Sequence, residues 1–161
     1  MRGFLSNAEL AALDVGAILT ADIADLAVTN AKLALPSGRT LIAVPVTLDT
    51  LLVGGGEIVT DILPGFAGTI DSIFFITGTP GVGAGATFAI TVEIGAIALT
   101  GGVLTVTLAA TATLGANIAA TAVTATNVFT DTDLLSILHA AGTVFTAGAG
   151  VIILVCSVAG Q

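Results

Sequence analysis

Every second residue of the segment 86–94 is apolar, whereas Thr91 and Glu93 occupy positions in between. Side chains of a β-strand point to opposite faces in turn, so this period of two predicts a strand with one buried face. A second run, 103–108, repeats the alternation, and residues 100–102 before it supply a turn. The two runs together predict a β-hairpin.

Six further segments are rich in β-branched or other apolar residues and are separated by turns that contain glycine or proline. We therefore expect an all-β fold, an antiparallel β-sandwich or jelly roll of about eight strands. Pro45 lacks a backbone N–H, so its segment should be an edge strand. The segments are 40–48, 57–63, 69–77, 119–124, 134–139 and 151–158, and turns are expected at 54–56, 64–65, 78–81, 113–117 and 147–150.

Two of these segments, 69–77 and 151–158, are apolar on both faces. One face would pack inside the sandwich, and the other would meet a neighbouring subunit. We expect Phe74, Phe75 and Ile153 to mark this oligomer interface. Because Phe74 and Phe75 are adjacent in a strand, one of them should lie in the core.

The charge distribution is extreme. The chain has three Lys and Arg against 11 Asp and Glu, a net charge of -8, and no basic residue of either type after Arg39. Binding to nucleic acid or to an anionic membrane requires clustered basic residues, so we expect neither partner. A body so apolar and so poor in charge must stay soluble through its threonines and few acids, or cover its surface with copies of itself. This pattern is typical of a structural building block.

The mean hydropathy of +1.12 raises a membrane protein as an alternative. The uncharged stretch between Glu93 and Asp131, and the C-terminal stretch after Asp133, are long enough to span a bilayer. Threonine and glycine recur in both, no basic cluster flanks them, and the chain has no Trp or Tyr. The orienting charges and aromatic belt of membrane helices are therefore missing, and the N-terminus lacks the apolar core of a signal peptide. We expect no membrane association.

Residues 1–39 are organised differently from the body, which we place at 40–161. Ser6 and Glu9 fit a capping box, which predicts a short helix near the N-terminus. The segment has too few large apolar residues to fold alone, so it should be an arm that is ordered by contact with a partner. The charged residues expected to make this contact, with acids facing basic groups of the partner, are Arg2, Asp22, Asp25, Lys32 and Arg39.

Catalytic constellations are nearly absent from the sequence. Ser136, His139 and Asp133 could be assembled into a hydrolase triad, but the sequence shows no nucleophile elbow. In strand register His139, the only histidine, shares a face with Leu135 and Ile137, so we expect it at an inward or interfacial edge. We predict no enzymatic activity and no catalytic residue.

Three other features have simple structural interpretations. The glycine-rich segment 78–85 lacks the Gly-Lys-Ser/Thr ending of a phosphate-binding loop, so we expect a turn between strands. Cys156 is the only cysteine and lies in an apolar run, which predicts a buried thiol. Asp131 and Asp133 are the best metal candidates, but no glutamate completes a calcium loop, so we expect them to solvate the surface, without metal or cofactor.

The segment 23–33, IADLAVTNAKL, resembles short segments that recur in tail-fibre and head-fibre proteins of tailed bacteriophages. The body is similar to phage virion proteins that sit on capsids or in fibres, in the segments 64–68, 92–95, 99–103 and 120–127. The resemblance implies a non-enzymatic, homotrimeric β-sandwich decoration (cement) or head-fibre protein on the capsid surface. Its arm would grip the major capsid protein or another virion protein. The sequence contains one copy of the fibre-like segment, whereas fibre shafts are built from many.

A tail-fibre or carbohydrate-binding receptor module is the alternative function, because jelly rolls are common lectin scaffolds. Sugar rings are usually held by stacking on aromatic side chains, and the absence of Trp and Tyr argues against this alternative.

Overall fold

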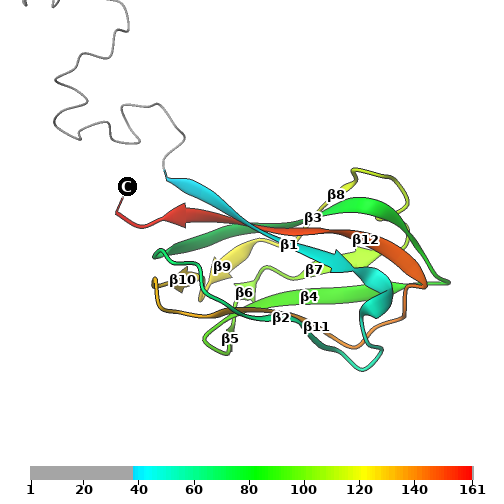
Figure 1. Cartoon of the computed structure of the whole chain (residues 1–161), viewed down its shortest axis with the longest axis horizontal. Helices are drawn as coiled ribbons and strands as arrows, with labels where there is room; N and C mark the ends of the chain where they lie inside the picture. Colours follow the sequence, from blue (N-terminus) through cyan, green and yellow to red (C-terminus); the bar gives the residue numbers. More distant parts are fainter. Residues whose placement is uncertain (1–37, 161) are drawn as a thin grey trace, which may run out of the picture. The chain divides into compact units, whose positions relative to one another are not determined.

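The computed structural model of the protein describes residues 38–160, which form an all-β fold (Figure 1). Every strand pairing among these residues is antiparallel. The expected N-terminal helix lies outside the described residues. The elements are β1 (Arg39–Thr47), the 3-10 helix η1 (Leu48–Thr50), β2 (Gly56–Ile62), β3 (Gly68–Val82), β4 (Thr87–Ile94), β5 (Ile97–Ala98), β6 (Thr100–Gly101), β7 (Leu104–Thr107), β8 (Asn117–Ala119), β9 (Val123–Ala125), β10 (Val128–Phe129), β11 (Leu135–His139) and β12 (Ala147–Val158).

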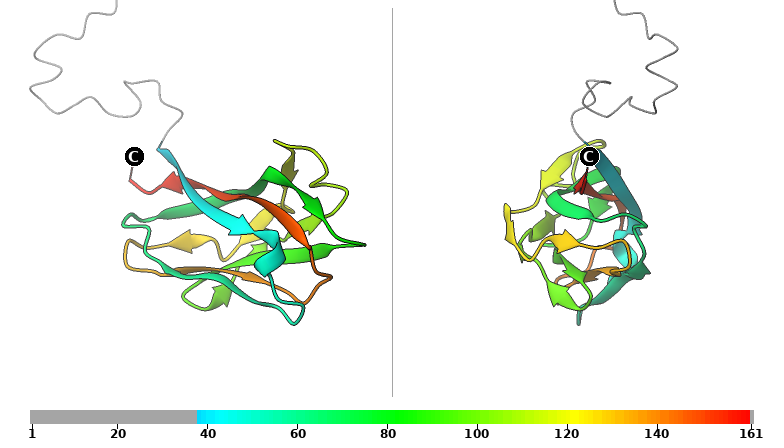
Figure 2. Two further views of the ribbon diagram at one scale, coloured as in Figure 1. Left: turned by 45° about the vertical axis from the view of Figure 1, so that its right-hand side comes forward. Right: turned by 90° about the vertical axis from the view of Figure 1, so that its left-hand side faces the viewer.

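The strands form two five-stranded sheets and one small sheet. Sheet A has the order β1-β12-β3-β10, with β8 also paired to β3. Sheet B has the order β2-β11-β4-β5, with β7 also paired to β4, and β6 and β9 form the small sheet. Sheets A and B lie face to face around one core, so the fold has the character of a β-sandwich (Figure 2).

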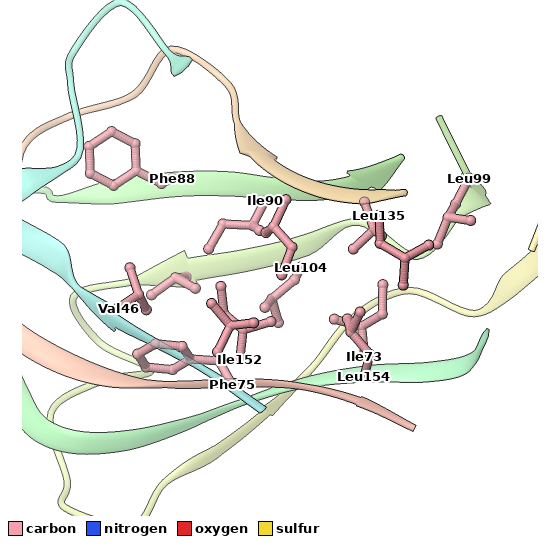
Figure 3. Close-up of a cluster of buried hydrophobic side chains, with 14 of the residues drawn as sticks. Val46, Ile73, Phe75, Phe88, Ile90, Leu99, Leu104, Leu135, Ile152 and Leu154 are labelled. Atoms are coloured by element: carbon pink, nitrogen blue, oxygen red, sulfur yellow. The ribbon is translucent and has the colours of Figure 1, made fainter. Parts of the chain in front are cut away.

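The core lies between the two sheets and follows the alternation of the sequence. In β4, residues Phe88 and Ile90 are buried while their neighbours along the strand are not. Ile90 faces Ile152 of sheet A, and these two side chains point into the space between the sheets in Figure 3. Phe75 of sheet A belongs to the same core. The burial of such side chains from both sheets is the main force that holds the sandwich together.

Two detailed strand predictions are confirmed. The segments 86–94 and 103–108 pair as β4 and β7, although β5 and β6 lie in the connection between them. Pro45 lies in an edge strand, because β1 pairs with β12 alone. The first strand begins at Arg39, one residue before the expected start of the body.

The turns expected at 78–81 and 147–150 are wrong, because these segments continue β3 and β12. Pro80 is tolerated there because it lies opposite a register shift between Ala147 and Ala149, where the ladder is irregular. Gly150 is required for close packing and does not form a turn. An added Cβ would overlap the Phe75 ring and the backbone of the neighbouring strand.

The strand expected at 119–124 is also wrong, since the segment is divided between β8 and β9 in different sheets. Two consecutive amides explain the division. The N–H of Ala120 donates to the carbonyl oxygen of Ile73 in β3, whereas the N–H of Thr121 donates to that of Val103, next to β7. The chain leaves sheet A at this point, so no single strand can continue through it.

Within the part of the chain that the structure describes, no helix has both the length and the apolar character that crossing a membrane requires.

Candidate functional site

The outer face of sheet A carries a continuous set of apolar side chains across β1, β12 and β3. The register places Ile153 between Ala43 and Phe74, and Val151 between Pro45 and Ile76. Val155 lies between Leu41 and the polar Ser72. Alternate residues of the same strands are buried in the core, so these eight apolar side chains point outward. We call them the apolar face: Leu41, Ala43, Pro45, Phe74, Ile76, Val151, Ile153 and Val155.

The structure separates the three residues expected at an oligomer interface. Phe74 and Ile153 are direct neighbours across β3 and β12 and are half-buried on the apolar face. Phe75 is fully buried between the sheets, so its assignment to the interface is wrong. Adjacent residues of a strand point to opposite faces, so Phe74 and Phe75 cannot both lie at the interface. The sequence had predicted that one of the two would lie in the core.

One end of the apolar face is bounded by a small polar cluster. Arg39 Nε lies 3.7 Å from Asp71 Oδ2, and the Ser157 hydroxyl donates to the same oxygen at 2.6 Å. The Arg39 side chain remains 60% exposed, so the ion pair leaves it open to a second contact. The role of Arg39 in partner binding stays a prediction, and the other expected contact residues, Arg2, Asp22, Asp25 and Lys32, lie outside the described residues.

The thiol of Cys156 is buried on the inner side of β12, as the sequence predicted. Loss of hydration in this apolar setting, with a smaller contribution from the Asp71 carboxylate, raises the pKa of Cys156 to about 11. A thiol in this state is a poor nucleophile at neutral pH, because the thiolate is the reactive form.

The outer face of sheet B is more polar, although Leu138 lies on it between Glu57 and Thr91. Ser136 and Glu93 are opposite each other in β11 and β4, and Thr105 in β7 and Glu57 in β2 are exposed. We call Glu57, Thr91, Glu93, Thr105 and Ser136 the polar face. The sandwich therefore presents one solvated outer face and one apolar outer face.

The possible triad of Ser136, His139 and Asp133 is not assembled. His139 points inward and is 5% exposed, with its ring packed edge-to-face on Phe88 at a centroid distance of 5.2 Å. Ser136 lies on the other side of β11, because it is three positions before His139 in the strand. The carboxylate of Asp133 accepts hydrogen bonds from the backbone N–H and the hydroxyl of Thr130.

His139 also borders an open groove of about 430 Å³ between the edge strands β1 and β2. Val46, Leu51 and Ile58 are among its other lining residues. Sequence reasoning missed this groove because it forms where the edges of two sheets meet. Only the order of the strands brings those edges together.

Asp133 organises its own loop. Its Oδ2 accepts hydrogen bonds from the Thr130 N–H at 2.7 Å and from the Thr130 hydroxyl at 2.9 Å. Together these bonds hold the pKa of the Asp133 carboxyl below its usual value. Asp131 is exposed, and among residues 38–160 no three His, Cys, Asp or Glu side chains are grouped to hold a metal ion.

The glycine-rich segment 78–85 is not a loop that could surround a phosphate. Its first five residues belong to β3, and the turn to β4 follows at 83–86. Gly81 is packed against the side chains of Thr111 and Phe145, where a Cβ would not fit.

Comparison with known proteins gives no match to a family model, to a curated protein or to a solved structure. The arguments about function therefore rest on the residues and surfaces described above.

Proposed function

We propose that this chain is a structural, non-enzymatic virion protein that decorates and stabilises the capsid of a tailed bacteriophage. In this proposal it forms a homotrimer with a jelly-roll-like body, and the arm 1–39 docks on the major capsid protein or another virion protein. The observation that carries the proposal is the apolar face. A long apolar surface on a chain with a single basic residue after position 38 is suited to burial in an assembly.

The internal chemistry of the body supports a structural role. His139 is packed on Phe88, the Cys156 thiol is buried, and Asp133 fastens a loop through Thr130. These three side chains therefore take part in packing or in a loop hydrogen bond. The resemblance of the segment 23–33 to fibre proteins supports a place in the virion.

A decoration protein stabilises a shell by adding contacts between neighbouring capsid subunits. Each docked trimer would bring three arms to the shell, and simultaneous docking of linked arms increases the apparent affinity without new contacts. The carboxylates of Asp22 and Asp25 would face basic groups on the capsid, and the polar face would remain in water.

The proposal is tested with capsids purified without the chain, to which the full-length protein is added back. We expect stoichiometric binding and a higher temperature of capsid disruption. The double variant D22N/D25N should bind more weakly, whereas the matched variant D131N in the body should bind like the unmodified protein. Binding of the chain to host cells, without binding to capsids, would instead favour the receptor-binding module.

A further inference from the structure

We propose that the apolar face is buried against the apolar faces of two other copies of this chain. The inference rests on the proposed function only in that both require a homo-oligomer. It adds the surface through which the copies meet and the way in which they pack, face to face rather than edge to edge.

The two outer faces of the sandwich differ in polarity. The register places Ile153 between Ala43 and Phe74 at the centre of sheet A, with no charged side chain among the eight residues of the apolar face. The corresponding surface of sheet B carries Glu57 and Glu93. Both sheets contribute to one core, so core packing does not explain why one outer face is more apolar than the other.

The edges of the sheets are poorly suited to pairing with another chain. Pro45 removes a donor from β1, and β2 has register shifts and a positive φ of 57° at Asp61. At the opposite edges, β10 and β5 have two residues each, β8 has three and β7 has four. Proline, bulges and short strands are the devices that prevent edge-to-edge association. Because the edges are unsuited to pairing, copies of the chain would associate through the apolar face.

The area of the surface and its polar rim can be compared with those of a standard interface. The outer face of β1, β12 and β3 measures about 14 Å by 30 Å from strand spacing and rise, which is about 400 Å² in projection and a lower bound on accessible area. A standard interface has about 800 Å² of accessible area per partner, with slightly more than half of it apolar and a polar rim. The apolar face supplies the centre, and Arg39, Asp71 and Ser157 supply a rim.

Charge favours another copy of this chain over a different partner. Two chains that each carry a net charge of -8 repel one another wherever carboxylates meet. The apolar face avoids this repulsion, and its rim presents one positive and one negative group side by side. Such a rim is self-complementary, because Arg39 of each copy can approach Asp71 of the next copy around the trimer.

The test is the molar mass of the full-length protein in solution, measured by light scattering after size exclusion over a range of concentrations. The variant I153D places a charge at the centre of the apolar face, and L41D does so at a side chain that is already 62% exposed. The control T105D adds the same charge to the polar face. We expect the unmodified protein and T105D to share an oligomeric mass, and I153D and L41D to fall to the 15.7 kDa of one chain.

Far-UV circular dichroism identifies a variant that fails to fold. If I153D fails to fold, the molar mass of L41D tests the inference, because Leu41 lies outside the core. A monomeric unmodified protein, or folded I153D and L41D with undiminished mass, overturns the inference. Capsid binding is measured separately. An oligomer that dissociates as expected but binds no capsid supports this inference and refutes the proposed function. A monomer that binds and stabilises capsids refutes this inference and the homotrimer but supports the decoration role.

Discussion

Gly150 lies near the start of the long strand β12, and the structure predicts a large cost for the smallest possible enlargement of this residue. A Cβ at position 150 would overlap the far end of the Phe75 ring and the carbonyl oxygen of Ile76. The ring can rotate or shift slightly, but the carbonyl belongs to the adjacent strand β3 and moves only if the ladder moves. The substitution G150A should therefore strain both the core and the sheet.

The expected magnitude follows from measured costs of overpacking. Extra methylene groups in a packed core cost about 1–3 kcal/mol, and the backbone overlap places G150A near the middle of this range or above it, at about 2 kcal/mol. For a folded body of this size, each kcal/mol corresponds to about 3–6 °C in Tm. The Tm of G150A should therefore fall by about 6–12 °C.

The assay is thermal unfolding followed by circular dichroism at one fixed chain concentration, so that oligomerisation affects all variants equally. The matched control is G54A, because a Cβ at Gly54 meets no atom within 4 Å. It should change stability by less than about 1 kcal/mol. In the double variant F75L/G150A the smaller side chain should recover part of the loss caused by G150A. Equal Tm values for G150A and G54A would refute the assignment of Gly150 to a packing role.

Three further predictions concern single side chains. F75A removes a fully buried ring and should cost about 3–5 kcal/mol in chemical denaturation, whereas a cost below 1 kcal/mol would contradict its place in the core. Burial raises the pKa of Cys156 from 9.0 to about 11, so the free energy of unfolding should be undiminished below pH 9 and fall as pH rises toward 11. This fall should be absent in C156A, and an identical pH profile for both proteins would count against the burial. The Asp133 carboxyl should titrate below its usual pKa of 3.8 in an NMR titration, so its contribution to stability is present at higher pH and lost as pH falls through the lowered pKa. T130V removes one of the two hydrogen bonds and should raise that pKa, and an unchanged value would show that the hydroxyl contributes nothing.

The sequence predicted those strands in which one face alone is buried. Residues 86–94 and 134–139 alternate in the structure as they do in the sequence, because a period of two is the direct signature of a half-buried strand. Pro45 likewise marked an edge strand, since an interior strand would need its missing donor.

Glycines and strand crossings could not be interpreted from the sequence alone. A glycine needed for close packing, such as Gly150, looks the same as a glycine in a turn, so the long strands β3 and β12 were predicted too short. The exit of the chain from sheet A after Ala119 depends on which carbonyl each amide reaches, and that is decided by tertiary structure.

The candidate surface could be predicted only in outline. Adjacency showed that Phe74 and Phe75 must face opposite ways, but nothing local indicated which of them points inward. The strand order decides this, because it places Phe75 opposite the inner face of sheet B. The alignment of Phe74 with Ile153 depends on the register of β3 and β12, which joins segments far apart in the chain.

The most direct test of the whole account is sedimentation of the full-length protein without detergent, over a wide range of chain concentrations. We expect a single soluble species with three times the chain mass of 15.7 kDa, because three apolar faces are buried together in the proposed trimer. A species with the mass of one chain at every concentration would show that the apolar face remains uncovered in solution, and it would contradict the account.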